Sequence, residues 1–254
     1  MDLPTGPPTA ALTVVLRERL LGVLDRKQHW AWPRFAEGKV PLPRLLPHFQ
    51  QEWEAYVRDF PILLARVLGH GPPARVRAML AANIYEEQTG GISQSAPHPE
   101  LFLQMMEGCR FSRAQFEQVR LLPAAAAYRE HLDRTSRDEP WVIGAALLTL
   151  FVEGSANERR ELASLSEPAP GTAEIEASLQ RHPLVRFHGV DPAALALVRV
   201  HKLVEGGHRS DAWEGVLDYV RPDQHEPLVA AMERSLDLWL AYRDGVAEAC
   251  GIER

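Results

Sequence analysis

Helical periodicity is the feature that most constrains the fold of this chain. Leu and Val recur at three- and four-residue spacing in most segments, as in residues 10–26 (AALTVVLRERLLGVLDR), which is typical of an amphipathic helix with one buried face. No pair of alternating apolar and polar segments joined by a hairpin turn occurs in the sequence. We therefore predict an all-α fold.

Proline and glycine divide the periodic segments. Pro61 predicts a bend, Gly90 and Gly91 a helix end, and Pro99 a helix start. Segment 166–183, rich in Pro and Gly, is predicted to be a connector with at most one short helical turn. We expect a single domain, residues 1–254 with a core of about 10–250, in which seven or eight helices form a bundle. The predicted helices cover residues 10–26, 41–70, 73–91, 98–111, 113–134, 139–163, 191–219 and 225–250.

Composition excludes several classes of protein. The net charge of −6 argues against nucleic acid or an anionic membrane as the main partner. No apolar run approaches the length of a membrane span, and the N-terminal segment does not resemble a signal peptide, so we expect a cytoplasmic protein. Two cysteines, Cys109 and Cys250, provide neither a disulfide framework nor a Cys-rich zinc site.

The segment HKLVEGGH places three metal-ligand types on one helix. His201, Glu205 and His208 stand at positions i, i+4 and i+7, which lie within about 60° of one another on an α-helix. Two imidazoles and a carboxylate suit zinc or non-haem iron. A solvated polar stripe is the alternative, although the adjacent glycines are unfavourable in a helix and indicate a close approach to a neighbouring group.

A second group of ligand types surrounds the predicted helix end at Gly90. Glu86 and Glu87 precede this end, where the helix dipole disfavours anions, and His98 opens the next helix. A loop between antiparallel helices can bring Glu87 and His98 to the same depth. The alternative is an exposed acidic helix end beside a surface histidine.

Glu153 follows a strongly apolar helical run. We expect it to be partly buried and therefore to need a metal or an arginine partner. Glu158 stands beside two arginines and is expected at the surface. Arg209 has three possible roles: to neutralise a carboxylate, to contact an acidic substrate, or to remain a surface charge.

The order of these segments (NIYEEQTGG, PHPELF, Glu153 and HKLVEGGH) resembles the haem-oxygenase-like diiron oxidases, over about residues 25–245. This group shares its seven-helix fold with pyrroloquinoline-quinone synthase and TenA-type proteins. The family motif N-x-x-[DE]-E followed by a histidine is matched by Asn83, Glu87 and His98. The last ligand helix of the family usually reads H-x3-D-x2-H, so Glu205 replaces the usual Asp.

The resemblance implies a non-haem diiron centre that activates O2 for chemistry on a small organic substrate in biosynthesis. The cofactor would be two Fe(II) ions per chain, with Mn possible. Whether Glu86 or Glu87 is the ligand stays open, and an upstream carboxylate found in some members has only weak matches in Glu52 and Glu54. A homodimer is common in related folds. The implied ligands are Glu87, His98, Glu153, His201, Glu205 and His208.

Two other functions are compatible with these residues. A cofactorless oxidase of the pyrroloquinoline-quinone synthase type would use the same histidines for acid–base work. A helical binding protein without catalytic activity would instead place Glu87, His98, Glu153 and His208 on separate faces. A TenA-type thiaminase is disfavoured because Cys109 does not stand where the motif order places the nucleophile.

Overall fold

The computed structural model describes residues 10–164 and 170–254, apart from the side chains of residues 10 and 204–208. Within that part the regular structure is helical, with thirteen α-helices and no β-strand, which confirms the prediction of an all-α bundle. The α-helices are α1 (Ala10–Leu24), α2 (Trp32–Ala36), α3 (Leu46–Glu52), α4 (Phe60–Gly69), α5 (Ala74–Thr89), α6 (His98–Gly108), α7 (Pro123–Asp138), α8 (Trp141–Ala145), α9 (Glu158–Ala163), α10 (Thr172–Gln180), α11 (Pro183–His188), α12 (Ala196–Leu217) and α13 (His225–Ala249). Shorter elements are the 3-10 turns η1 (Leu42–Leu45), η3 (Arg113–Phe116), η6 (Pro192–Leu195) and η7 (Pro222–Gln224), and the π-helices η2 (Trp53–Val57) and η4 (Ala146–Val152).

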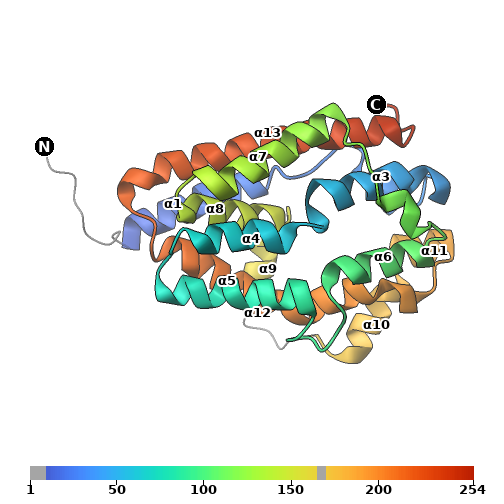
Figure 1. Cartoon of the computed structure of the whole chain (residues 1–254), viewed down its shortest axis with the longest axis horizontal. Coiled ribbons are helices and arrows are strands. Elements are labelled where there is room, and N and C mark those ends of the chain that lie inside the picture. The colour runs from blue at the N-terminus through green and yellow to red at the C-terminus, as the bar shows by residue number, and fades with distance from the viewer. Residues whose placement is uncertain (1–9, 165–169) are drawn as a thin grey trace, which may run out of the picture.

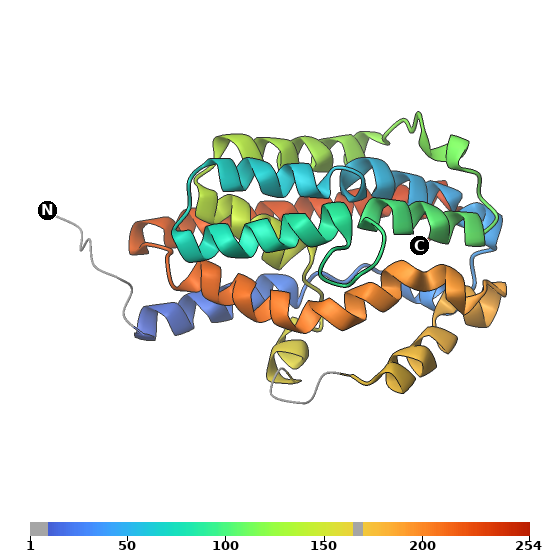
Figure 2. The ribbon, with the colours of Figure 1, turned by 60° about the horizontal axis from the view of Figure 1, so that its bottom comes forward.

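The long helices pack as an elongated bundle (Figure 1). Helix α13 packs along α7 and also contacts α1, while α4 lies against both α5 and α7. In the second view α5 and then α6 run alongside α12 (Figure 2). The stacked rings of Tyr128 on α7 and Tyr242 on α13, with centroids 5.6 Å apart, join two of these helices in the core. None of the described helices is long and apolar enough to cross a membrane.

The number of helices exceeds the prediction because interruptions divide the longest predicted segments. Segment 41–70 contains η1, α3, η2 and α4, and its break lies at Arg58–Asp59, so that Pro61 falls in the first turn of α4. Segment 139–163 divides into α8, η4 and α9. The connector 166–183 carries α10, nine residues long and therefore longer than the predicted single turn.

Helix α5 ends at Gly90, as predicted from the sequence. Gly90 has a left-handed backbone, with φ of 64°, which residues with a Cβ atom adopt at a cost. A Cβ at this position would lie 2.4 Å from the carbonyl oxygen of Ser95. Gly90 therefore lets the chain turn back at once into the loop that leads to His98, the first residue of α6.

The π-helix η4 ends against a lysine from α1's C-terminal loop. Lys27 Nζ donates hydrogen bonds to the carbonyl oxygens of Phe151 (2.5 Å) and Gly154 (2.7 Å), with a longer contact to that of Val152 (3.3 Å). These carbonyls have no continuing helix to supply their N–H donors. Lys27 therefore fixes the backbone on both sides of Glu153.

Replacing Gly90 tests whether this turn holds the loop in place. We expect Gly90→Ala to lower the free energy of unfolding by at least about 1–2 kcal/mol, because alanine is strained at positive φ. Gly22→Ala, in the last turn of α1 with no atom of another segment within 4 Å of the added Cβ, is the matched control and should stabilise the helix by up to about 0.5–1 kcal/mol. Chemical denaturation measures both. Equal effects of the two substitutions would contradict this account.

Lys27 makes the stability of the fold depend on pH. Burial, with the nearby charge of Arg243, lowers the pKa of Lys27 from 10.5 to about 7. Between these values the unfolded chain binds the proton and the folded chain does not, so the free energy of unfolding rises with pH. Lys27→Met should remove this rise between pH 7 and pH 10, whereas Lys39→Met, at an exposed surface ion pair, should keep it. Urea denaturation across this range measures the free energy of unfolding of wild type, Lys27→Met and Lys39→Met. The same dependence on pH in all three proteins would refute the expectation.

Candidate metal centre

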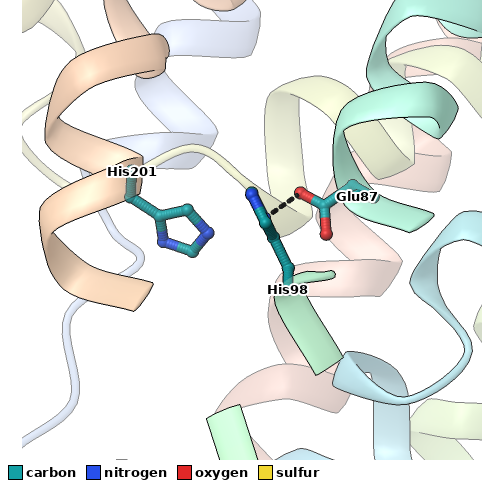
Figure 3. Close-up of side chains that lie close together, drawn as sticks. All are labelled: Glu87, His98 and His201. Carbon is teal, nitrogen blue, oxygen red and sulfur yellow. Dashed lines mark ion pairs between the residues drawn. The ribbon is translucent and has the colours of Figure 1, made fainter. Parts of the chain in front are cut away.

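Three of the predicted ligands converge from three different helices. Glu87 near the end of α5, His98 at the start of α6 and His201 on α12 offer ligand atoms that all lie within 4.8 Å of one another. His98 lies between the other two side chains (Figure 3), and its ring centroid is 5.0 Å from that of His201. His98 is buried and Glu87 nearly so, while His201 is half-buried. We refer to these residues as the three-residue cluster.

Glu86 holds His98 from the side away from Glu87. The Nε2 atom of His98 lies 3.1 Å from Oε1 of Glu86, and Oε2 of Glu86 accepts hydrogen bonds from the backbone amides of Ile92 (2.8 Å) and Ser93 (3.0 Å). Burial alone would raise the pKa of Glu86, but the hydrogen bonds from Ser93, His98 and Ile92 outweigh it and lower the pKa. A fully buried, ionised Glu86 therefore accepts the Nε2 proton and orients the imidazole. Of the two adjacent carboxylates, it is Glu87 that joins the cluster.

The other nitrogen of His98 is suited to a cation. Its Nδ1 atom is buried without a hydrogen bond, yet lies 3.0 Å from Oε1 of Glu87. Because Glu86 takes the Nε2–H, a neutral His98 has its lone pair on Nδ1, beside the lone pairs of a carboxylate. Two such atoms need a proton or a metal ion between them. Two ligands at right angles, as in octahedral coordination, each about 2.1 Å from one ion, lie about 3.0 Å apart, so the pair fits a metal of that geometry.

The proton and the metal are alternatives for this position. Burial alone would lower the pKa of His98, but Glu87 and Glu86 outweigh it and raise the pKa. The same carboxylates that favour a protonated imidazole also favour a bound cation. Imidazole and carboxylate ligands together suit iron, manganese or zinc.

A cavity of about 280 Å³ opens beside the cluster. Its apolar walls come from η2, α4, η4 and α12. Besides the two histidines of the cluster, the lining of the cavity includes three carboxylates and one arginine. The residues that line it are Tyr56, Val57, Phe60, Glu87, His98, Thr149, Val152, Glu153, Gly154, Glu158, Leu197, His201 and Arg209.

Glu153 lines this cavity but does not belong to the three-residue cluster. Its Oε1 atom accepts a hydrogen bond from Nδ2 of Asn83 (2.9 Å), which is buried on α5. The residue is exposed, so the expectation of partial burial was wrong. The apolar π-helix stops at Val152, and the chain then turns, leaving Glu153 at the wall of the cavity rather than in the core.

The side chains of Glu205 and His208 lie outside the described residues. Helix α12 runs continuously from Ala196 to Leu217, so the backbone on which the predicted H-x3-E-x2-H spacing depends is helical. The adjacent glycines do not interrupt the helix.

Glu158 is a buried residue of the cavity that the sequence did not reveal. The prediction that it lies at the surface was wrong, since its side chain is 2% exposed. It pairs with Arg209, which also contacts Glu161 (2.7 Å), and it accepts a hydrogen bond from Nε1 of Trp213 (2.9 Å). Of the roles open to Arg209, neutralisation of carboxylates is the one observed. The sequence places Arg209 and Trp213 four residues apart, on one face of α12, but this spacing does not indicate that Glu158 is the residue they contact.

The upstream carboxylates occupy other positions. Glu52 accepts hydrogen bonds from Arg243 (2.7 Å) and Tyr56 (3.1 Å), and Glu54 pairs with Arg58 (2.6 Å). Neither residue lines the 280 Å³ cavity. The structure therefore does not bring an upstream carboxylate from α3 or η2 to the cluster.

Comparison with known proteins identifies the fold and the family. A solved structure described as a TenA homolog from Pseudomonas syringae pv. tomato str. DC3000 superimposes with a TM-score of 0.64, covering 98% of this chain and 96% of that chain at 15% identity. At this identity the likeness shows a shared fold, and it confirms the predicted TenA-like architecture. The sequence matches no curated protein. The family of iron-containing redox enzymes matches residues 47–240. This span is more than half of the chain and includes the three-residue cluster, so the protein belongs to the family of iron-containing redox enzymes.

Proposed function

We propose that this protein is a non-haem diiron oxidase or oxygenase that uses O2 to transform a small organic substrate. The observation that carries the proposal is the Nδ1–Oε1 pair of His98 and Glu87, 3.0 Å apart, with no hydrogen bond and with His201 in the same cluster. This arrangement needs a proton or a metal ion between the two atoms, and the family, one of iron-containing enzymes, favours the metal.

The remaining ligands are part of the proposal. Glu153 lines the same cavity, and Glu205 and His208 follow His201 by one and two turns on α12. Three carboxylates and three histidines would suffice for two ferrous ions and leave positions for O2 and substrate. Iron held in this set would supply the electrons that reduce O2.

The chain's own residues would prepare this chemistry. Glu86 orients His98, and Asn83 holds one oxygen of Glu153. The apolar side chains of Val57, Phe60 and Leu197 limit the water in the cavity. Arg209 neutralises Glu158, so this carboxylate does not add an uncompensated charge to the site.

Metal content and O2 uptake test the proposal directly. Wild-type protein loaded anaerobically with Fe(II) should hold about two iron atoms per chain and consume O2 when air is admitted. His201→Ala should lose at least half of the iron and most of the O2 uptake. His225→Ala removes a histidine that does not line the cavity and should change neither. Elemental analysis that finds no iron in the loaded wild-type protein would overturn the proposal.

A cofactorless oxidase is the second candidate, because the raised pKa of His98 is equally consistent with a protonated imidazole paired with Glu87. The two functions differ in their response to a chelator. Turnover that survives complete removal of iron would favour the cofactorless enzyme, whereas the diiron enzyme loses all activity and regains it with Fe(II).

Glu86 provides a sharper test of metal binding than a ligand deletion. We expect Glu86→Gln to weaken Fe(II) binding by about 10–100-fold, because an amide has one acceptor oxygen for three N–H donors and no longer orients His98. Glu100→Gln, at an exposed ion pair on α6, should leave the affinity unchanged. Anaerobic competition with a chromogenic chelator measures the dissociation constants. Equal affinities in the two variants would show that Glu86 has no role in the metal site.

A further inference from the structure

A second cavity, of about 880 Å³, lies next to the 280 Å³ cavity and is lined by basic rather than acidic side chains. We call it the aromatic chamber. Its described lining contains five aromatic residues and two cations but no Asp or Glu, in a chain whose net charge is −6. The lining residues are Lys27, Gln28, His29, Trp30, Trp32, Pro33, Ala36, Tyr56, Tyr128, Val152, Gly154, Ser155, Ala156, Asn157, Trp239 and Arg243.

The two cavities share a wall. Tyr56 on η2, Val152 at the end of η4 and Gly154 line both of them. On one side of this wall the cavity has carboxylates and histidines suited to metal ions, and on the other side the chamber has the basic side chains of Lys27 and Arg243. A molecule that reaches past the wall would therefore meet an anion-binding region and a metal-binding region at its two ends.

Arg243 forms the cationic floor of the chamber. Its side chain is 5% exposed, and its guanidinium carbon lies 5.1 Å from the ring centroid of Trp32 and 5.3 Å from that of Trp239. One nitrogen pairs with Glu52 (2.7 Å), while Nε is buried without a hydrogen-bond partner among the described residues. A buried N–H donor of this kind lacks the hydrogen bond that such groups normally make.

Lys27 adds a second cation below its pKa of about 7, and it adds no carboxylate. Its ammonium group contacts backbone carbonyl oxygens and lies 4.8 Å from the ring centroid of Phe151 and 5.6 Å from that of Trp239. The chamber opens towards solvent near Trp30 and Trp32, whose residues are 38% and 40% exposed. A flat apolar body can therefore lie between indole rings, with an acidic group at the cations.

We propose that the aromatic chamber binds an organic carboxylate with a flat, apolar body, and that this compound is the substrate. Binding of the anion follows from the chamber alone. The role of substrate rests on the proposed function, because the far end of the compound would extend past Tyr56 and Val152 towards the metal ligands. The chamber thereby selects an acid whose reacting group is distant from its carboxylate.

Binding of 2-naphthoate to iron-free protein tests the chamber, with neutral 2-naphthamide as the matched ligand. Isothermal titration calorimetry at pH 6, where Lys27 is protonated, should give a dissociation constant at least about tenfold lower for the carboxylate. Ala36→Trp, which fills the chamber from α2, should abolish binding of 2-naphthoate. Ala127→Trp, an equally exposed alanine on α7 that lines a different cavity, should not change it.

Three outcomes would overturn the proposal. They are equal affinities for the carboxylate and the amide, unchanged binding in Ala36→Trp, and displacement of 2-naphthoate by inorganic phosphate at the same concentration. The last result would indicate a site for any anion, without selection for the apolar body. Lys27→Met gives a further check, since it should weaken binding of 2-naphthoate about tenfold and leave that of 2-naphthamide unchanged.

The test of 2-naphthoate binding gives a result that is independent of the test of iron binding. Iron content is measured in the same preparations of Ala36→Trp and Ala127→Trp, which should both hold as much iron as wild type. A protein that binds 2-naphthoate but no iron would keep the chamber and refute the diiron function. A protein that binds iron but not 2-naphthoate would refute the chamber and keep the diiron function.

Discussion

The carboxylate of Glu86 is the constraint on which the candidate site depends. One of its oxygens accepts two backbone amides of the loop after α5, and the other faces Nε2 of His98 on α6. A fully buried carboxylate without these donors would be strongly unfavourable, so the loop and the imidazole must take these positions together. The orientation of His98 towards Glu87 and His201 is a consequence of how this one buried charge is satisfied.

Much of this arrangement could be predicted from the sequence because it depends on local features. Gly90 ends α5, Pro99 lies in the first turn of α6, and the short loop between them brings Glu87 and His98 to one level. Such features involve residues near one another in the chain, where backbone preferences decide the conformation. The choice between Glu86 and Glu87 could not be made this way, because it depends on which side of α5 faces the bundle.

Predictions failed where a residue's environment comes from distant segments. Glu158 follows the pattern of a surface residue, with two arginines beside it, yet Arg209 and Trp213 of α12 cover it. Glu153 follows an apolar run, yet it is exposed because η4 ends one residue earlier. The aromatic chamber is of the same kind, since its lining comes from segments as far apart as Lys27 and Arg243. The spacing of residues within one helix does not reveal such contacts between distant segments.

The two π-helices explain why the cavities adjoin. A π-helix departs from the regular register of an α-helix and recurs at functional sites. Here η2 provides Tyr56 and Val57, and η4 provides Thr149 and Val152, all at the wall of the 280 Å³ cavity. Because η4 ends at Val152, its last carbonyl oxygens need donors, and Lys27 supplies them while lining the aromatic chamber. The lysine that completes the backbone beside Glu153 is thus also one of the two basic groups that make the neighbouring chamber suitable for an anion.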